Sequence, residues 1–417
     1  MMKNFGVQRT IVVVIFILVV VAEAIIAFRS YTTGPKRQEL SPVKGVATSD
    51  TFKKEGQTAL LSRNFDLAVV SYDQALKKNL EDVEALRGAA LSRAAKIQAE
   101  NKKEVSGEAL LFIDRAIGVE PEKSENYQIK GYIQEVSLDC KSAVESYNRA
   151  LALDQKNAYA YSGLGHCMSY FGDEKQTDEF YGMAHQLSPN DPLISLSYAS
   201  HVLMRKALYD EAMPILEKIS IDKKADSYVR AEADTLLGNI LMEKNDFLGA
   251  RKKYELAIQS DSSHSISYVG KGRSILFSIL SGKSSGGTAD IRIMFDSYDR
   301  AQRLNPNAAL ARYWQGTTLR YIGRNDLGKQ VLLNGLEVVD QDVTLWGPDS
   351  RNTLKALFHY QLAAAAVSES DWSGGVGQLR SAFLLDSSLI NSYKKDIGNP
   401  LYFEKAKGRA EFLSLAK

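Results

Sequence analysis

The stretch AYAYSGLGHCMSYFGDEKQTDEFYGMAHQLSPND, residues 158–191, decides how the rest of the chain is interpreted. Numbered from Ala158, it has an aromatic residue at position 4, a Leu-Gly pair at positions 7 and 8, and a large apolar residue at position 11. A Gly-Asp turn follows near position 15, and then Tyr at 24, Ala at 27 and Pro at 32. Small residues at 8 and 27 let two helices approach closely, while the proline suits the start of the next helix. The stretch therefore predicts a helix-turn-helix unit that needs no chemistry to explain it.

The same pattern recurs in near-continuous register from about Ser49 to about Leu389. Extra residues interrupt it at 97–105 and at 281–288, and the unit that begins near Pro192 is looser than the others. The clearest copies have Gly at position 8 and Tyr at position 24: Gly56 with Tyr72, Gly131 with Tyr147, Gly238 with Tyr254, and Gly272 with Tyr298. This pattern resembles the tetratricopeptide repeat (TPR), a 34-residue helix-turn-helix unit. The resemblance implies an all-α, right-handed superhelical solenoid of about nine TPR-like repeats.

The two ends of the chain differ from the repeats. We expect residues 1–10 to form a short N-terminal tail, 11–28 a transmembrane signal-anchor, 29–48 a flexible tether, 49–389 the TPR array, and 390–417 C-terminal capping helices. The anchor is predicted from the almost unbroken apolar run IVVVIFILVVVAEAIIAF, which is near the lower length limit for a spanning helix. The terminal segment could cover the apolar face that a last repeat leaves open.

A cleaved signal peptide is the alternative to the anchor. The triplet Ala22-Glu23-Ala24 has the small-x-small pattern of a cleavage site. We prefer the uncleaved anchor because the apolar run continues for four residues beyond Ala24, which a cleavage region does not require. Basic residues flank the segment on both sides, so the positive-inside rule leaves its orientation open.

Composition and spacing argue against several functional classes. Lys plus Arg is 52 and Asp plus Glu is 50, so the net charge is +2, and this near-balance speaks against nucleic-acid binding driven by charge. Two cysteines, Cys140 and Cys167, are too few for a disulfide framework and lack metal-site spacing. The five histidines show no H-x-x-x-H or H-E-x-x-H pairing, and no G-x-S-x-G motif occurs. We therefore expect no enzyme activity, no cofactor and no metal site.

The resemblance also implies a binding surface. In TPR proteins, positions 2, 5, 9, 12 and 13 of a repeat tend to face the concave groove. Exposed Tyr and Arg are typical anchors of protein interfaces. The alternative, that several of these side chains pack against neighbouring helices, stays open. The candidate partner-binding residues are Tyr132, Tyr159, His166, Tyr170, Arg273, Tyr313, Arg320 and Tyr321.

One specific activity of the family can be tested on the sequence. Some TPR proteins grip the C-terminal carboxylate of heat-shock chaperones with a Lys and an Asn in the first repeat, an Asn in the second, and a Lys and an Arg in the third. Here Lys53 matches, but Gln57 and Gly88 replace the asparagines, and Glu125 and Ile129 replace the last two cations. Such a clamp would lose most of its donors, so we do not expect it.

We expect a membrane-anchored TPR scaffold or adaptor that binds protein partners along its groove, in the assembly of an envelope machine for secretion, pilus, flagellar or polysaccharide export. Two alternatives are a cytosol-facing receptor for client or targeting peptides and a regulatory subunit of a membrane enzyme. The expected partners are proteins or peptides, and the membrane through residues 11–28, with no nucleic acid; self-association stays open. The expected location is a bacterial inner membrane, single-pass, with the array in the periplasm and the sidedness open.

Overall fold

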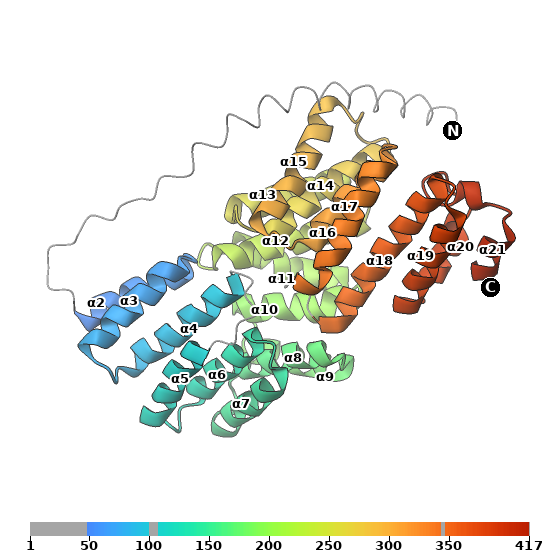
Figure 1. The fold of residues 1–417 in the computed structure, drawn as a ribbon. Helices are drawn as coiled ribbons and strands as arrows, with labels where there is room; N and C mark the ends of the chain where they lie inside the picture. Colours follow the sequence, from blue (N-terminus) through green and yellow to red (C-terminus); the bar gives the residue numbers. More distant parts are fainter. Residues whose placement is uncertain (1–47, 100–106, 343–346, 417) are drawn as a thin grey trace. The chain divides into compact units, whose positions relative to one another are not determined.

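The computed structural model describes residues 48–99, 107–342 and 347–416, and in these it contains helices, turns and loops but no strand (Figure 1). Contacts divide the chain into two compact units. We call Ser41–Leu236 the first unit and Leu237–Lys417 the second unit. The boundary falls inside one helix, α12 (Ser227–Glu243).

The first unit is a row of helix pairs in chain order, in which each helix packs against the next (Figure 1). The fifth pair departs from the others, because a π-helix continues its first helix and Pro214 lies inside its second. The helices are α2 (Ser49–Leu61), α3 (Phe65–Lys78), α4 (Val83–Ala99), α5 (Gly107–Val119), α6 (Ser124–Val136), α7 (Cys140–Leu153), α8 (Ala158–Phe171), α9 (Glu174–Leu187), α10 (Pro192–Tyr198), the π-helix Ala199–Met204 and α11 (Tyr209–Ile221).

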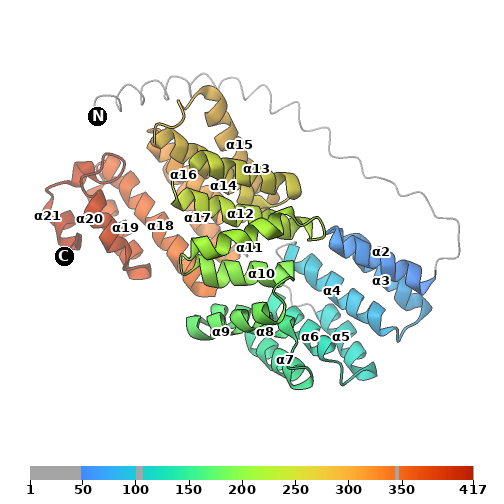
Figure 2. The same ribbon diagram turned by 180° about the vertical axis from the view of Figure 1, so that it is seen from behind.

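The second unit continues the pairs and ends in shorter elements. In both views α20 lies beside α19 (Figure 1 and Figure 2). The helices are α13 (Phe247–Ser260), α14 (Ser265–Leu280), α15 (Thr288–Leu304), α16 (Ala309–Tyr321), α17 (Asn325–Val338), α18 (Gly347–Ser368), α19 (Trp372–Leu385), α20 (Leu389–Asp396) and α21 (Ala410–Leu413), with 3-10 turns at Val339–Gln341, Glu404–Ala406 and Ser414–Ala416.

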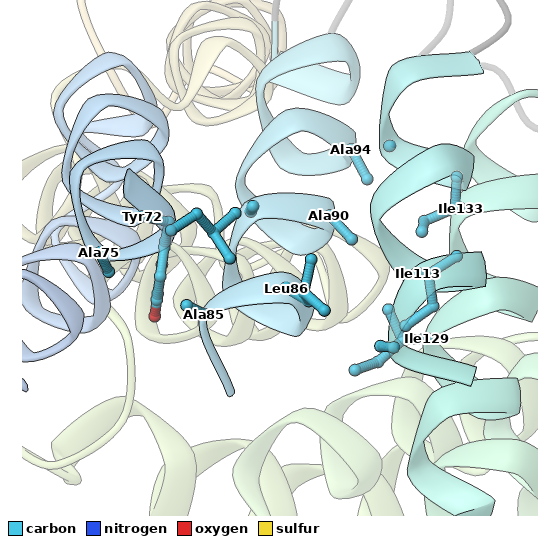
Figure 3. Packing of buried hydrophobic residues seen from close by; sticks show 13 residues of the cluster. Tyr72, Ala75, Ala85, Leu86, Ala90, Ala94, Ile113, Ile129 and Ile133 are labelled. Carbon is cyan, nitrogen blue, oxygen red and sulfur yellow. The ribbon is translucent and has the colours of Figure 1, made fainter. Parts of the chain in front are cut away.

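In several repeats a buried tyrosine packs against the next repeat, as Tyr72, Tyr147 and Tyr254 do. Tyr72 points from α3 toward α4 and belongs to the core that also holds Leu86 and Ile113 (Figure 3). Its ring fills the space above two glycines: a Cβ added at Gly56 would lie 2.7 Å from the ring, and one at Gly88 would lie 2.1 Å from it. Gly56, at position 8, therefore leaves room for the tyrosine ring of its own repeat. Gly88, in the next repeat, leaves room for the same ring on its other side.

Five of the described turns inside the pairs share one construction. A residue with positive φ ends the first helix, and the side chain of the following Asn or Asp accepts a hydrogen bond from a backbone N–H in the first turn of the second helix. This cap satisfies a donor that the helix itself leaves unpaired. The pairs of residues are Arg63 with Asn64, Leu138 with Asp139, Gly172 with Asp173, Asn245 with Asp246, and Ser370 with Asp371.

The predicted location in a membrane is corrected by the structure. Within residues 48–99, 107–342 and 347–416, no helix combines the length and the apolar character that a membrane span requires. The prediction of a single-pass inner-membrane protein with a periplasmic array is therefore wrong on this finding. Its physical basis was the apolar run at 11–28, and that segment, like the predicted tail 1–10 and nearly all of the predicted tether 29–48, lies outside the described residues.

Candidate protein-binding surfaces

The first helices of successive repeats form a continuous surface in the first unit. There α2 packs against α4, α4 against α6, α6 against α8, and α8 against α10. We call this surface the first-helix wall. It carries four of the predicted groove residues, Tyr132, Tyr159, His166 and Tyr170.

Cations on the first-helix wall are paired between neighbouring repeats. The Lys53 Nζ lies 3.0 Å from Asp82 and 2.8 Å from Glu84, and the hydrogen bond to Glu84 is the largest cause of its raised pKa. Arg87 forms an ion pair with Glu120, and its Nε donates to Asn126 at 2.7 Å. Lys53, the one residue that matched the chaperone clamp, is thus held by carboxylates of its own chain.

A histidine–carboxylate cluster lies in the middle of the wall. The buried Glu135 accepts from the Tyr147 hydroxyl at 2.7 Å and pairs with His166 Nδ1 at 2.6 Å. The His201 ring lies 5.6 Å from the His166 ring and stacks on Tyr181 at 4.9 Å. Burial, followed by the charges of His166 and Arg205, lowers the pKa of His201 to about 3. His201 is therefore held neutral beside a carboxylate–histidine pair.

The three tyrosines of the wall keep part of their surface in solvent. Tyr159 is 44% exposed, and its hydroxyl donates to Asp191 at 2.6 Å. Tyr132 is partly buried and donates to Gln98 at 2.9 Å. Tyr170, also partly buried, lies edge-on to Phe171, with 5.7 Å between the ring centroids. Each of these tyrosines thus contacts another side chain and keeps part of its own surface accessible.

Two cations that the repeat positions do not predict, Arg205 and Lys206, pair with carboxylates of α9. Arg205 pairs with Glu174 at 2.7 Å and with Asp178, and Lys206 Nζ lies 2.7 Å from Asp178. Arg205 directly follows the π-helix, in the repeat whose pattern is loosest. A position count based on the regular 34-residue unit cannot place this side chain, because the π-helix shifts the register.

The other four predicted residues lie in the second unit and are more enclosed. The Arg273 guanidinium lies 5.5 Å from the centroid of Trp314. Tyr313 is buried and packs edge-on against Phe358 at 5.5 Å. Arg320 is 5% exposed, and Tyr321 packs against Tyr402 with 6.0 Å between ring centroids. Leu401 and Tyr402 of the C-terminal segment thus cover Arg320 and Tyr321, which their repeat positions predict to face an accessible groove.

Among the described residues, no three His, Cys, Asp or Glu side chains gather as a metal site would require. Cys140 and Cys167 are both free and buried. A hydrogen bond with Cys140, followed by burial, raises the pKa of the Cys167 thiol, which disfavours the reactive thiolate.

Comparisons with known proteins place the chain by its fold. No protein-family profile and no curated protein sequence matches it. Its structure is similar to human IFIT1 in a dimer with m7Gppp-AAAA, with 13% identity, a TM-score of 0.59, and coverage of 89% of this chain and 86% of that one. It is also similar to the APC/C hetero-tetramer Cut9–Hcn1, with 14% identity and a TM-score of 0.57. That match covers 77% of this chain and 57% of the other chain. The fold is a tetratricopeptide-repeat solenoid.

The prediction of an all-α repeat array is therefore confirmed. The Cut9–Hcn1 match spans little more than half of that chain's length, and identities this low establish the fold alone. The domain boundaries and the roles of the eight groove residues stay predictions, as does the absence of enzyme activity.

Proposed function

We propose that this TPR solenoid is a non-catalytic adaptor that binds a protein segment on the first-helix wall of the first unit. One observation carries the proposal: Tyr132, Tyr159, His166 and Tyr170 lie on consecutive first helices, and the three tyrosines keep surface accessible beside the Glu135–His166 pair. Partly exposed Tyr and His side chains offer apolar area together with hydrogen-bonding groups, which suits protein contacts.

The charges of the wall favour a peptide over nucleic acid. The human IFIT1 structures contain m7Gppp-AAAA or PPP-AAAA, ligands with phosphate groups. In this chain Lys53, Arg87 and Arg205 are already paired with carboxylates, so they offer phosphates little uncompensated charge. The absence of nucleic-acid binding therefore remains our prediction. The envelope machines expected from the sequence depended on a membrane anchor, and the proposal does not extend to them.

The experiment is a selection of peptides from a random display library against the full chain. We expect the selected peptides to lose at least about tenfold in affinity when His166→Ala and Tyr170→Ala are combined, because two central contacts disappear. The control is Leu111→Ala, an exposed residue of α5 on the opposite helix set, which should leave affinity unchanged. Peptides that bind the double variant as tightly as the wild type would place the binding surface elsewhere.

A further inference from the structure

A cavity of about 500 Å³ lies in the second unit. It opens between the end of α16, the start of α17, the end of α18 and the C-terminal segment 400–405. A volume of this size falls in the usual range of small-molecule and side-chain pockets. Its walls include Arg320, Ile322, Val367, Leu401, Tyr402 and Lys405.

Arg320 is the unusual member of the lining. It is 5% exposed, and within the described residues its two terminal nitrogens donate to the Leu401 carbonyl alone, at 3.1 and 3.4 Å. Among the residues that the structure describes, the Nε of Arg320 has no hydrogen-bond partner and no carboxylate pairs with the guanidinium. A buried cation without a counter-charge is costly, and proteins normally pair such a group. Burial accordingly lowers the pKa of this guanidinium.

The remaining charges indicate which kind of anion would fit. Lys405 and Glu404 both line the cavity from exposed positions, and Lys405 Nζ donates to the Ser368 carbonyl at 2.5 Å. One Arg, one Lys and one Glu leave a net charge of +1 on the lining, which matches a monoanion better than a dianion. The helix α17 begins at the cavity, at Asn325, without a side-chain cap, so its first amides add partial positive charge.

The apolar part of the lining indicates what the anion is attached to. Ile322, Ala364, Val367 and Leu401 surround the cavity with aliphatic carbon, and Tyr402 adds an aromatic ring. The ring of Tyr402 is itself held in place by Tyr321 and Tyr360, with centroids 6.0 and 5.9 Å away. A ligand that carries its charge at one end and apolar carbon at the other would meet both parts of this surface.

We propose that this cavity binds the carboxylate of a ligand with an apolar body, with the guanidinium of Arg320 as the principal donor. Guanidinium and carboxylate match in geometry, and charge-assisted pairs of this kind are among the strong hydrogen bonds. The residues that line the cavity all belong to the second unit and none belongs to the first-helix wall, so either proposal can fail without the other.

The test measures binding of N-acetyl-phenylalanine to the full chain by calorimetry, beside N-acetyl-phenylalaninamide, which has the same body without the charge. We expect the acid to bind and the amide to bind at least about tenfold more weakly. Arg320→Met should lower affinity for the acid by a similar factor, whereas Arg303→Met, which changes an exposed arginine of α15, should leave it unchanged. Glu404→Gln should tighten binding by up to about fivefold, since an exposed opposing charge is removed.

Three results would overturn the proposal. The first is equal affinity for acid and amide, or binding of neither at millimolar concentration. The second is an Arg320→Met chain that is folded by circular dichroism and binds the acid as the wild type does. The third is inorganic phosphate that competes with the acid at lower concentration than acetate does, which would assign the site to phosphate. Glu404→Gln keeps the test decisive if Arg320→Met does not fold, because Glu404 is exposed and its loss should not disturb the core.

Discussion

At the scale of single residues, the tyrosine–glycine contacts between repeats leave no room for an added side-chain atom. A Cβ on Gly163 of α8 would lie 2.1 Å from the buried Tyr147 ring, so Gly163→Ala must displace that ring. We expect Gly163→Ala to lower the free energy of unfolding by about 1–3 kcal/mol. The matched control is Gly182→Ala in α9, where a Cβ meets nothing within 4 Å. It should raise stability by up to about 1 kcal/mol. Urea unfolding of both variants decides this, and equal effects would contradict the packing argument.

His201 gives the solenoid a pH dependence at the same scale. Its folded pKa, about 3, lies below the ordinary histidine value of about 6.5, so between these values the unfolded chain binds a proton that the folded chain does not. Stability therefore falls as the pH falls through this window, by at most about 1.4 kcal/mol per pH unit and less where solvent reaches the ring. His201→Phe preserves an aromatic ring against Tyr181 and removes the titration. The unfolding free energies at pH 7 and pH 5 should differ less in this variant than in the wild type; an unchanged difference would exclude His201 as the cause.

The sequence predicts side-chain contacts within one repeat better than contacts between repeats. The Gly at position 8 and the Tyr at position 24 belong to the same unit, so their spacing indicated their contact. Gly88 and Gly163 contact the tyrosine of the preceding repeat, and no pattern within one unit reveals such a partner. Tyr313 and Arg320 were placed on an open groove by their positions, but Arg320 contacts the main chain at Leu401, 81 residues later.

At the scale of elements, the C-terminal cap shows where periodicity stops being informative. The apolar residues Leu401, Phe403, Ala406, Ala410 and Leu413 have a helix-like spacing within the segment 390–417, for which capping helices were predicted. Phe403 and Ala406 are indeed buried, but short 3-10 turns and the four-residue α21 replace a long helix. The buried positions therefore no longer follow the helical spacing at the end of the segment, where Phe412 is buried and Leu413 is exposed. Elements this short do not keep a 3.6-residue period long enough for it to be read.

The shifted register gives a matched pair of substitutions in the cap. Phe412 is fully buried, and its ring lies edge-on to the Trp372 ring with 6.3 Å between the centroids. Its backbone carbonyl accepts a hydrogen bond from the Tyr393 hydroxyl at 3.0 Å. We expect Phe412→Ala to cost about 3–5 kcal/mol, because it leaves a cavity in the cap. Leu413 is 44% exposed, so Leu413→Ala should change stability by no more than about 0.5 kcal/mol. Thermal unfolding of the two variants tests this, and a larger loss for Leu413→Ala would mean that the helical register holds after all.

At the scale of the whole molecule, each repeat depends mainly on its neighbours. Among the described helices, most contacts join elements that are next to each other in the chain or one further on, and stability in such arrays is close to a sum of repeat and interface terms. The cation–π contact of Arg63 with Tyr228, at 4.5 Å, joins distant parts of the first unit and is worth only about 0.5–1 kcal/mol. Gly163→Ala should therefore raise amide hydrogen exchange in α6 to α9 and leave α18 and α19 as protected as in the wild type. Phe412→Ala should raise amide hydrogen exchange in α18 and α19 and leave α6 to α9 as protected as in the wild type. If either variant increased exchange uniformly over the described helices, the chain would unfold as one cooperative block, and the repeats would not be the units of its stability.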